Sequence, residues 1–193
     1  MGALADGALP PRLFEGWHHD AMGDGLRRAT LNLQDYARRA RSDRCFICQI
    51  VAGSHPFEHE VIYRDDQAIA FLNRFPTLLG YCLVAPVDHR VDIIHEFDEE
   101  AYLRLQAVVR RVAVAVAAVV PTERTYVLSL GSNEGNAHVH WHIAPLPPGV
   151  PYEEQQFKAL MLETSGYIDL DPAETKALAD RIRAALNDSA GCR

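Results

Sequence analysis

Three histidines alternate with apolar residues over residues 138–142, which read His-Val-His-Trp-His. Because successive side chains of a β-strand point to opposite faces, this spacing predicts a strand with all three imidazoles on one face. Val139, Trp141 and Ile143 share the other face, which suits packing in a core. Neighbouring ring nitrogens can bind a metal, hold phosphate oxygens or attack a phosphorus atom. The pattern therefore restricts the function to phosphate chemistry or metal chemistry.

The composition is that of an ordinary folded protein, with 48% hydrophobic and 23% charged residues in a chain of 193. That length allows one good-sized domain with extensions. The apolar run at 112–120 is shorter than a membrane span, and the first residues lack the pattern of a secretory signal. We therefore expect a cytoplasmic protein with no membrane partner. A net charge of -7 argues against a nucleic-acid partner, although a local site could hold a small anion.

Apolar periodicity and turn residues divide the chain into an N-terminal extension at 1–43, a central domain at 44–150 and a C-terminal helical extension at 151–193. Besides the histidine strand, which should end at Pro145, strands are predicted at 60–64, 68–72, 81–85 and 125–130. Helices are predicted at 24–41, 45–52, 99–120, 152–162 and 172–186. This order of elements, with short antiparallel-type connections, predicts the α+β class.

Two predicted helices carry further information. The helix at 99–120 follows Asp98, a good N-cap residue, and stops before Pro121. It has more apolar residues than one face needs, which fits either a subunit interface or burial inside a monomer. The helix at 24–41 has a basic face, and we interpret it as a surface helix packed on the domain, with contact to a partner as the alternative.

Two of the four cysteines suggest a metal site. Cys45 and Cys48 have the C-x-x-C spacing of zinc ligands, but one such pair is only half a site. The alternative is a pair of small residues packed in a helical turn. Cys82 lies in an apolar run and is expected to be a buried thiol. The sequence around Cys192, near the end of the chain, predicts no role for this cysteine.

Residues 45–148 resemble the histidine triad (HIT) family. The family signature His-φ-His-φ-His-φ-φ, where φ is apolar, is matched by residues 138–144. The segment Cys-Phe-Ile-Cys at 45–48 is similar to a cysteine pair near the start of many HIT domains. Residues 70–76 resemble the ribose-binding end of a family strand, and residues 80–89 resemble its G-H-x-L-V-x-P-x-x-H segment. The resemblance implies a HIT-like fold, in which an antiparallel sheet carries one long packed helix.

The resemblance also implies a nucleotide hydrolase that cleaves a phosphoanhydride or phosphoramidate bond at the α-phosphate. His140, the middle histidine, would attack the phosphorus and form a covalent nucleotidyl intermediate, with His138 and His142 in supporting places. Adenine nucleotides, including dinucleoside polyphosphates, are the expected substrates. Further nucleotide contacts are expected on the two loops that flank the central strands, from Asn73, Asn133, Gly135 and Asn136. For each asparagine the alternative is ordinary turn chemistry.

Some relatives in this family complete the cysteine pair into a structural zinc site. The matching positions here are Cys45, Cys48, His89 and His138, a set of thiolates and imidazoles that suits zinc. The same resemblance implies a homodimer that pairs along an edge strand and the long helix. The chain departs from the family pattern in three places. The loop at 135–137 is shorter than the glycine-rich loop that precedes the triad in many members. Trp141 replaces an aliphatic residue, and the third motif position is His142 rather than glutamine.

Other functions remain open at this stage. A transferase or phosphorylase could use the same intermediate, with phosphate in place of water. The three histidines could instead hold a catalytic metal with open coordination. A nucleotide-binding interaction protein with little turnover is the third alternative.

Overall fold

The computed structural model describes residues 26–41 and 44–190. The start of the helix predicted at 24–41, most of the N-terminal extension and Cys192 lie outside these residues. In the part that is described, no helix has both the length and the apolar character that crossing a membrane requires.

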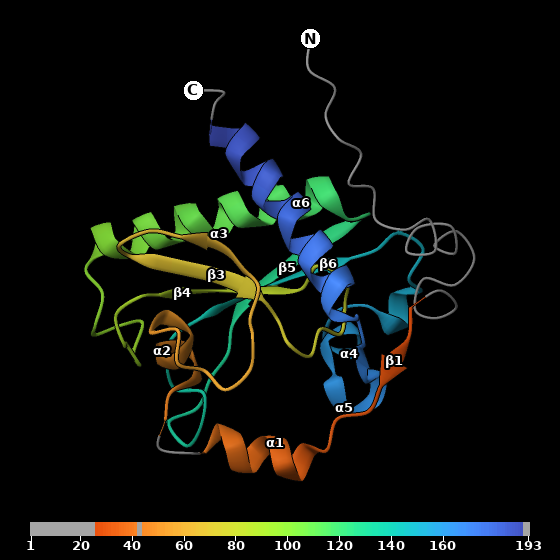
Figure 1. Ribbon diagram of the computed structural model, residues 1–193, viewed down its shortest axis with the longest axis horizontal. Helices are drawn as coiled ribbons and strands as arrows, with labels where there is room; N and C mark the ends of the chain where they lie inside the picture. The colour runs from red at the N-terminus through yellow and green to blue at the C-terminus, as the bar shows by residue number, and fades with distance from the viewer. Residues whose placement is uncertain (1–25, 42–43, 191–193) are drawn as a thin grey trace.

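The centre of the fold is a five-stranded antiparallel sheet with the strand order β2-β3-β4-β6-β5 (Figure 1). Its strands are β2 (Val61–Arg64), β3 (Ala68–Leu72), β4 (Cys82–Pro86), β5 (Arg124–Ser129) and β6 (Trp141–Leu146). The side chain of Asp65 accepts hydrogen bonds from the backbone of Gln67 and Ala68 and so closes the turn between β2 and β3. The sheet confirms the predicted α+β class, and it confirms the strands predicted at 60–64, 68–72, 81–85 and 125–130 to within one residue at each end.

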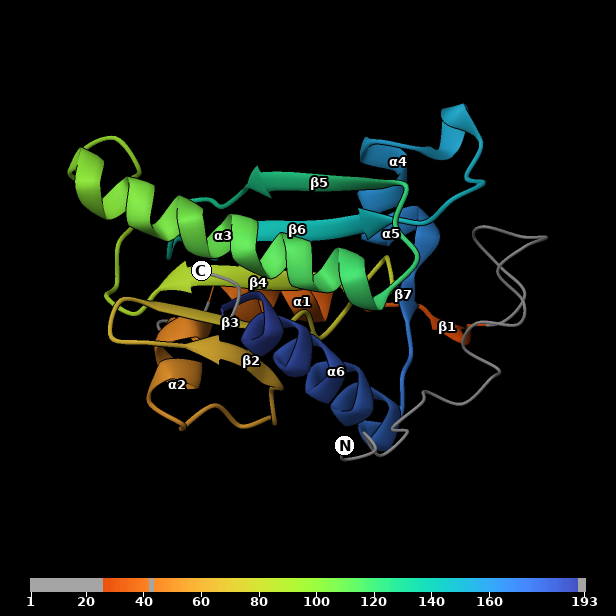
Figure 2. The ribbon, with the colours of Figure 1, turned by 90° about the horizontal axis from the view of Figure 1, so that it is seen from above.

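The long helix α3 (Glu99–Val119) covers one face of this sheet, as Figure 2 shows from above. It begins as predicted, because the side chain of Asp98 accepts a hydrogen bond from the backbone of Ala101. Alternate residues of β3, β4 and β6 form a core with α3, whereas the intervening residues pack on the other face with α2 (Phe46–Val51). The three central strands β3, β4 and β6 therefore lie between helices and are buried on both faces, whereas the edge strands β2 and β5 are more exposed.

The helix α6 (Pro172–Ala190) packs beside α3 on the same face. Its apolar residues Leu178, Ile182 and Leu186 belong to the same core as α3. Part of the apolar excess of α3 is therefore explained by burial within one chain. Leu103 and Val114 of α3 remain exposed.

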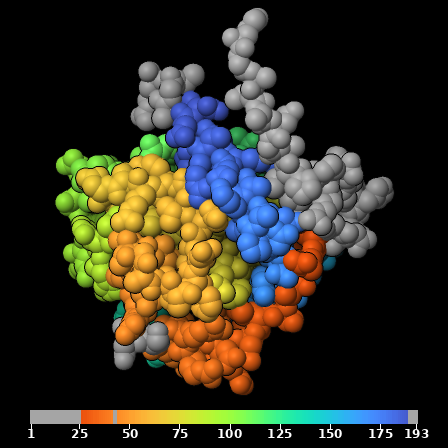
Figure 3. Space-filling view, viewed as in Figure 1, coloured from red at the N-terminus to blue at the C-terminus, as the bar shows by residue number. Residues whose placement is uncertain are grey.

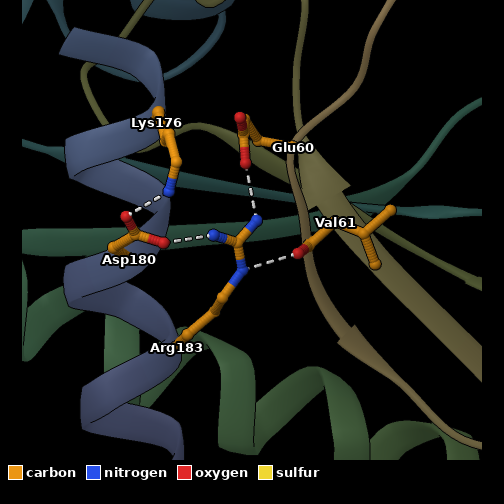
Figure 4. A network of polar contacts seen from close by, with 5 residues as sticks. All are labelled: Glu60, Val61, Lys176, Asp180 and Arg183. Carbon is orange, nitrogen blue, oxygen red and sulfur yellow. Dashed lines mark hydrogen bonds and ion pairs between the residues drawn. The ribbon is translucent and has the colours of Figure 1, made fainter. Parts of the chain in front are cut away.

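An arginine near the middle of α6 ties this helix to the edge of the sheet (Figure 4). The guanidinium of Arg183 lies 2.6 Å from the carboxylate of Glu60, and it donates a hydrogen bond to the backbone carbonyl of Val61. Arg183 also contacts Asp180, which pairs with Lys176. In the space-filling view of Figure 3, α6 lies directly against the segment that contains β2.

The prediction of one continuous helix at 152–162 is wrong. This segment holds three short helical pieces separated by breaks: η2 (Tyr152–Glu154), α4 (Phe157–Leu160) and α5 (Leu162–Ser165). One break is at Gln156, which has φ of 58° and whose backbone N–H donates to the hydroxyl of Tyr126 on β5. A tertiary contact therefore interrupts a segment that is helical by local pattern.

The helix predicted at 24–41 is too long. Residues 28–29 instead form β1 (Arg28–Ala29), which pairs with β7 (Tyr167–Ile168) in a separate two-stranded sheet. Only α1 (Leu33–Ala40) is helical, and it begins where Asn32 caps it. Gly166 is required beside this pairing, because a Cβ there would lie 2.6 Å from the carbonyl oxygen of Ala29. The two extensions are thus joined to each other across the fold.

Candidate active site

The predicted histidine strand starts later than expected. Strand β6 begins at Trp141, so only His142 lies in the ladder, and residues 138–140 precede it without regular secondary structure. The alternation is confirmed on the apolar side, where Val139, Trp141 and Ile143 are buried in the core with α3. The three imidazoles lie on the opposite side, as predicted. His138 contacts the cysteine pair of α2, and His140 contacts Phe46 of the same helix. His142 contacts Tyr81, which packs in the core on that face.

His140 is buried, with 4% of its surface exposed. Its Nδ1 lies 2.7 Å from the backbone carbonyl of His138, and since a carbonyl only accepts, the ring donates there. Burial lowers the pKa of His140, although this hydrogen bond acts in the opposite direction. The hydroxyl of Ser129 on β5 donates to the carbonyl of His140 over 2.8 Å and fixes the backbone. A neutral His140 ring therefore has an unprotonated Nε2.

His142 lies beside His140, with 4.7 Å between the two ring centroids. Its Nδ1 is 3.0 Å from the hydroxyl of Tyr81, and its Nε2 is buried with no hydrogen-bond partner among the described residues. Burial and the neighbouring His140 lower the pKa of His142 to about 4, with the carbonyl of Leu130 acting in the opposite direction. Two neutral imidazoles thus lie side by side at neutral pH.

The cysteine pair and two histidines form a compact cluster next to these rings. Sγ of Cys45 is 3.4 Å from Nδ1 of His138, and Sγ of Cys48 is 3.2 Å from Nδ1 of His89. All four donor atoms lie within 4.8 Å of one another. The opposite nitrogen of His138 donates to the carbonyl of Pro86 over 3.0 Å, which leaves Nδ1 free to act as a ligand.

The spacing of this cluster fits a tetrahedral zinc ion. With Zn–S of about 2.3 Å and Zn–N of about 2.0 Å, neighbouring donors in a tetrahedral site are about 3.3–3.8 Å apart. Two of the sulfur–nitrogen separations, 3.4 and 3.6 Å, fall within this range, and the third, 3.2 Å, is just below it. Burial and the neighbouring Cys45 raise the pKa of Cys48 to about 11, so this thiol needs a cation before it ionises at neutral pH. The helix α2 presents both cysteines because Cys45 is its N-cap.

The residues predicted to contact a nucleotide lie on two separate loops. Asn73 follows β3, and its side-chain oxygen accepts a hydrogen bond from the backbone of Phe75 over 3.0 Å, which is the turn chemistry expected of asparagine. Asn133 is exposed in the turn that Ser132 and Gly135 close by backbone hydrogen bonds. Asn136 has φ of 56°, a left-handed conformation that asparagine tolerates.

Helix α1 joins these two loops. The side chain of Asn136 donates to the hydroxyl of Tyr36 over 3.2 Å, and the ring of Tyr36 packs edge-on against Phe75. A Cβ at Gly135 would lie 2.8 Å from the carbonyl oxygen of Ala40, so the loop and the helix are in close contact. The N-terminal extension therefore contributes to the surroundings of the predicted nucleotide site.

Three residues near the predicted site were not predicted from the sequence: Tyr81, Ser129 and Tyr36. The sequence pattern could have identified Tyr81 as a site residue, because Tyr81 follows a glycine at the place where the G-H-x-L-V-x-P-x-x-H pattern has a histidine. No sequence pattern could have identified Ser129 or Tyr36, since their contacts depend on strand register and on the docking of α1.

The family model described as "HIT domain" matches residues 56–148. An uncharacterized HIT-like protein of Saccharolobus solfataricus is 31% identical over 105 residues, which cover 52% of this chain and 73% of that protein. The adenosine 5'-monophosphoramidase hnt1 of Schizosaccharomyces pombe is 29% identical over 136 residues, 64% of this chain and 98% of that protein.

Solved structures show the same fold. A zinc-bound histidine triad family protein from Mycobacterium smegmatis aligns with a TM-score of 0.61 at 24% identity, covering 77% of this chain and 97% of that one. A hypothetical histidine triad nucleotide-binding protein from Sulfolobus tokodaii aligns with a TM-score of 0.60 at 24% identity, covering 75% and 93%. These likenesses confirm the predicted HIT-like fold.

Proposed function

This chain belongs to the HIT family, and we propose that it is a nucleotide hydrolase that cleaves a phosphoanhydride or phosphoramidate bond at the α-phosphate. The observation that carries the proposal is the hydrogen bond from Nδ1 of His140 to the carbonyl of His138. It leaves the Nε2 lone pair as the nucleophile, and burial keeps the ring unprotonated at neutral pH.

The reaction has two displacements at phosphorus. In the first, Nε2 of His140 forms a bond to the α-phosphorus while the bond to the leaving oxygen or nitrogen breaks, and the leaving group takes up a proton from solvent. The intermediate carries a positive imidazolium, and the His138 carbonyl stabilises it by accepting the Nδ1–H. In the second, water attacks the phosphorus, its proton leaves to solvent, and Nε2 is released with the nucleoside monophosphate.

The remaining histidine and the two loops are proposed to bind the nucleotide. His142 supplies a hydrogen-bond donor to a phosphoryl oxygen or to the leaving group. The backbone N–H of Asn136 contributes a further donor, with Asn133 at the tip of the same turn. Gly135, whose N–H already donates to the carbonyl of Ser132, lets the backbone lie close to the nucleotide. Asn73 holds the ribose through the amide group that is not used in its turn, and Tyr36 closes the space between the two loops.

We propose that a structural zinc ion is bound by four ligands: Cys45, Cys48, His89 and His138. The donor set and its spacing support this, and the solved structure from M. smegmatis with the same fold is zinc-bound. When bound, the ion would cross-link α2 to the approach of β6 and fix the carbonyl that orients His140. The tri-histidine metal centre is the weaker alternative, because His138 faces the thiols and His140 is oriented by a backbone carbonyl.

A homodimer is proposed through the exposed edge of the sheet. Strand β5 is an edge strand, with Val127 exposed on it and Leu103 and Val114 exposed on α3. Sedimentation of the purified protein tests this, since a dimer mass is expected and a monomer mass at micromolar concentration would contradict it.

Adenosine conjugates are the proposed substrates, and the S. pombe relative, an adenosine 5'-monophosphoramidase, supports the phosphoramidate class. The test is incubation with adenosine 5'-phosphoramidate and with diadenosine tetraphosphate, in the presence and absence of inorganic phosphate. We expect AMP from at least one of them, and His140→Ala should abolish it while the exposed His95→Ala should not. Formation of ADP only when phosphate is added would identify a phosphorylase, and binding without product would overturn the hydrolase proposal.

A further inference from the structure

Tyr81 is a buried tyrosine whose backbone is held in place at the start of β4. Its N–H donates to the carbonyl of Leu78 over 3.1 Å, and its carbonyl accepts from the N–H of Asn73 over 2.9 Å. The preceding Gly80 has φ of 82°, a conformation that favours glycine. The position of the Tyr81 ring is therefore set by the local backbone, independently of any ligand.

The phenol hydroxyl of Tyr81 reaches the ring of His142 on the neighbouring strand. Leu83 pairs directly with His142, so Tyr81 is the diagonal neighbour on the same face of the sheet. Its hydroxyl oxygen is 3.0 Å from Nδ1 of His142, and the two rings meet edge-on at 88°. In the described part of the chain, this hydroxyl has no second hydrogen-bond partner.

The direction of this hydrogen bond follows from which groups need partners. Burial raises the pKa of Tyr81 and lowers that of His142 to about 4, so both side chains are neutral at pH 7. If Nδ1 carried the imidazole proton, it would donate to the hydroxyl and leave a buried phenolic hydrogen without an acceptor. With the proton on Nε2, the hydroxyl donates to Nδ1 and both groups are satisfied.

We infer that Tyr81 is a positioning residue whose hydroxyl donates to Nδ1 of His142 and thereby holds the imidazole proton on Nε2. His140 and His142 then have opposite tautomers, because His140 carries its proton on Nδ1. One ring presents a lone pair and its neighbour presents an N–H, with 4.7 Å between their centroids. A phosphate group in contact with both would meet a nucleophile and a donor together.

The buried Nε2 of His142 is the place where the donor is needed. No described residue forms a hydrogen bond of normal geometry with it, although the carbonyl of Leu130 lies near the ring, and this costs free energy until a well-placed acceptor arrives. The identity of that acceptor, an oxygen of the α-phosphoryl group or the leaving group, rests on the proposed function. A histidine at position 81 could exchange tautomers or take a proton near neutral pH, whereas a neutral phenol always offers its O–H.

The first test is the protonation pattern of the His142 ring, measured by nitrogen NMR on protein labelled at the histidine ring nitrogens. Tyr81→Phe removes only the hydroxyl and keeps the ring that packs in the core. In the unmodified protein without nucleotide we expect Nε2 protonated and Nδ1 unprotonated, and in Tyr81→Phe a mixture of both tautomers. Tyr63→Phe is the matched control, because its hydroxyl contacts Asp65 on the far side of the sheet.

The second test is the rate at which the nucleotidyl-enzyme forms from adenosine 5'-phosphoramidate. We expect Tyr81→Phe to slow this step about tenfold to a hundredfold with little change in KM, the size expected when one donor is misplaced. An unchanged His142 tautomer or an unchanged rate would overturn the inference. If the unmodified protein forms no nucleotidyl-enzyme, the proposed function fails, and the NMR measurement still decides the role of Tyr81 in setting the tautomer.

Discussion

The Nδ1–H group of His140 donates a hydrogen bond to the backbone carbonyl of His138 over 2.7 Å. The same residue His138 directs its own Nδ1 at the thiols of Cys45 and Cys48. A ligand to the proposed zinc is therefore also the residue that sets the tautomer of the proposed nucleophile. Any change that moves His138 should alter both the metal content and the reactivity of His140.

Removing the cysteine pair should release the metal. We expect Cys45→Ser, Cys48→Ser to lose about one equivalent of zinc by elemental analysis and to unfold at a lower temperature, because a structural zinc binds only the folded state. Cys82→Ala is the control for loss of a thiol, since Cys82 is fully buried in the core and is not part of the cluster. Zinc retained by the double serine variant would place the metal elsewhere.

His59 should make stability depend on pH. Burial, His55 and Arg74 lower the pKa of His59 to about 4, whereas an unfolded histidine titrates near 6.5. Between these values the unfolded chain binds the extra proton, so the contribution of His59 to stability is full above pH 6.5 and is lost as the pH falls towards 4. Because the ring is only partly buried, we expect about 1 kcal/mol of this loss between pH 7 and pH 5.

Urea unfolding at pH 7 and pH 5 measures this effect. The free energy of unfolding should fall more between the two pH values in the unmodified protein than in His59→Gln. His95→Gln should not reduce the fall, because Asp92 raises the pKa of His95, which gives the opposite sign. Equal pH dependence in the unmodified protein and His59→Gln would show that His59 titrates normally in the fold.

Arg183 should anchor α6 more strongly than the exposed pair beside it. Arg183→Met removes the contacts with Glu60 and the Val61 carbonyl, and we expect a loss of about 2 kcal/mol in the free energy of unfolding. Lys176→Met removes only an exposed ion pair with Asp180, and a loss below about 0.5 kcal/mol is expected. Equal losses in the two variants would mean that the link to β2 contributes nothing specific.

Gly135 should control the docking of α1. A methyl group there would lie 2.8 Å from the carbonyl oxygen of Ala40, so Gly135→Ala must push the helix and the loop apart. We expect faster hydrogen exchange in residues 33–40, and no such change in Asn133→Ala, whose side chain is on the exposed tip of the same turn. Unchanged protection of α1 in Gly135→Ala would show that the loop absorbs the methyl group.

The elements that the sequence predicted well are those whose signals are local. Strand β3 agrees with the prediction at both ends because an apolar run lies between the turn at Asp65 and the loop at Asn73. Helix α3 starts and stops as predicted because Asp98 caps it and Pro121 cannot continue it. The five-stranded sheet and its α+β class follow from such signals together.

The errors come from contacts between distant parts of the chain. Each strand of the β1–β7 pair has two residues, too few for a periodic pattern, and the pairing joins the two extensions. Gln156 interrupts a helical pattern because its backbone binds Tyr126 on another strand. None of these contacts has a signal within a short window of sequence.

The covalent step is tested most directly by acid-free quenching of the enzyme with adenosine 5'-phosphoramidate, followed by mass spectrometry of the intact protein and its peptides. We predict that a protein heavier by one adenylyl group appears before steady state, and that the added mass maps to His140. His140→Asn should show no such species. A full rate of AMP release without any adduct, or an adduct on another residue, would contradict the assignment of His140 as nucleophile.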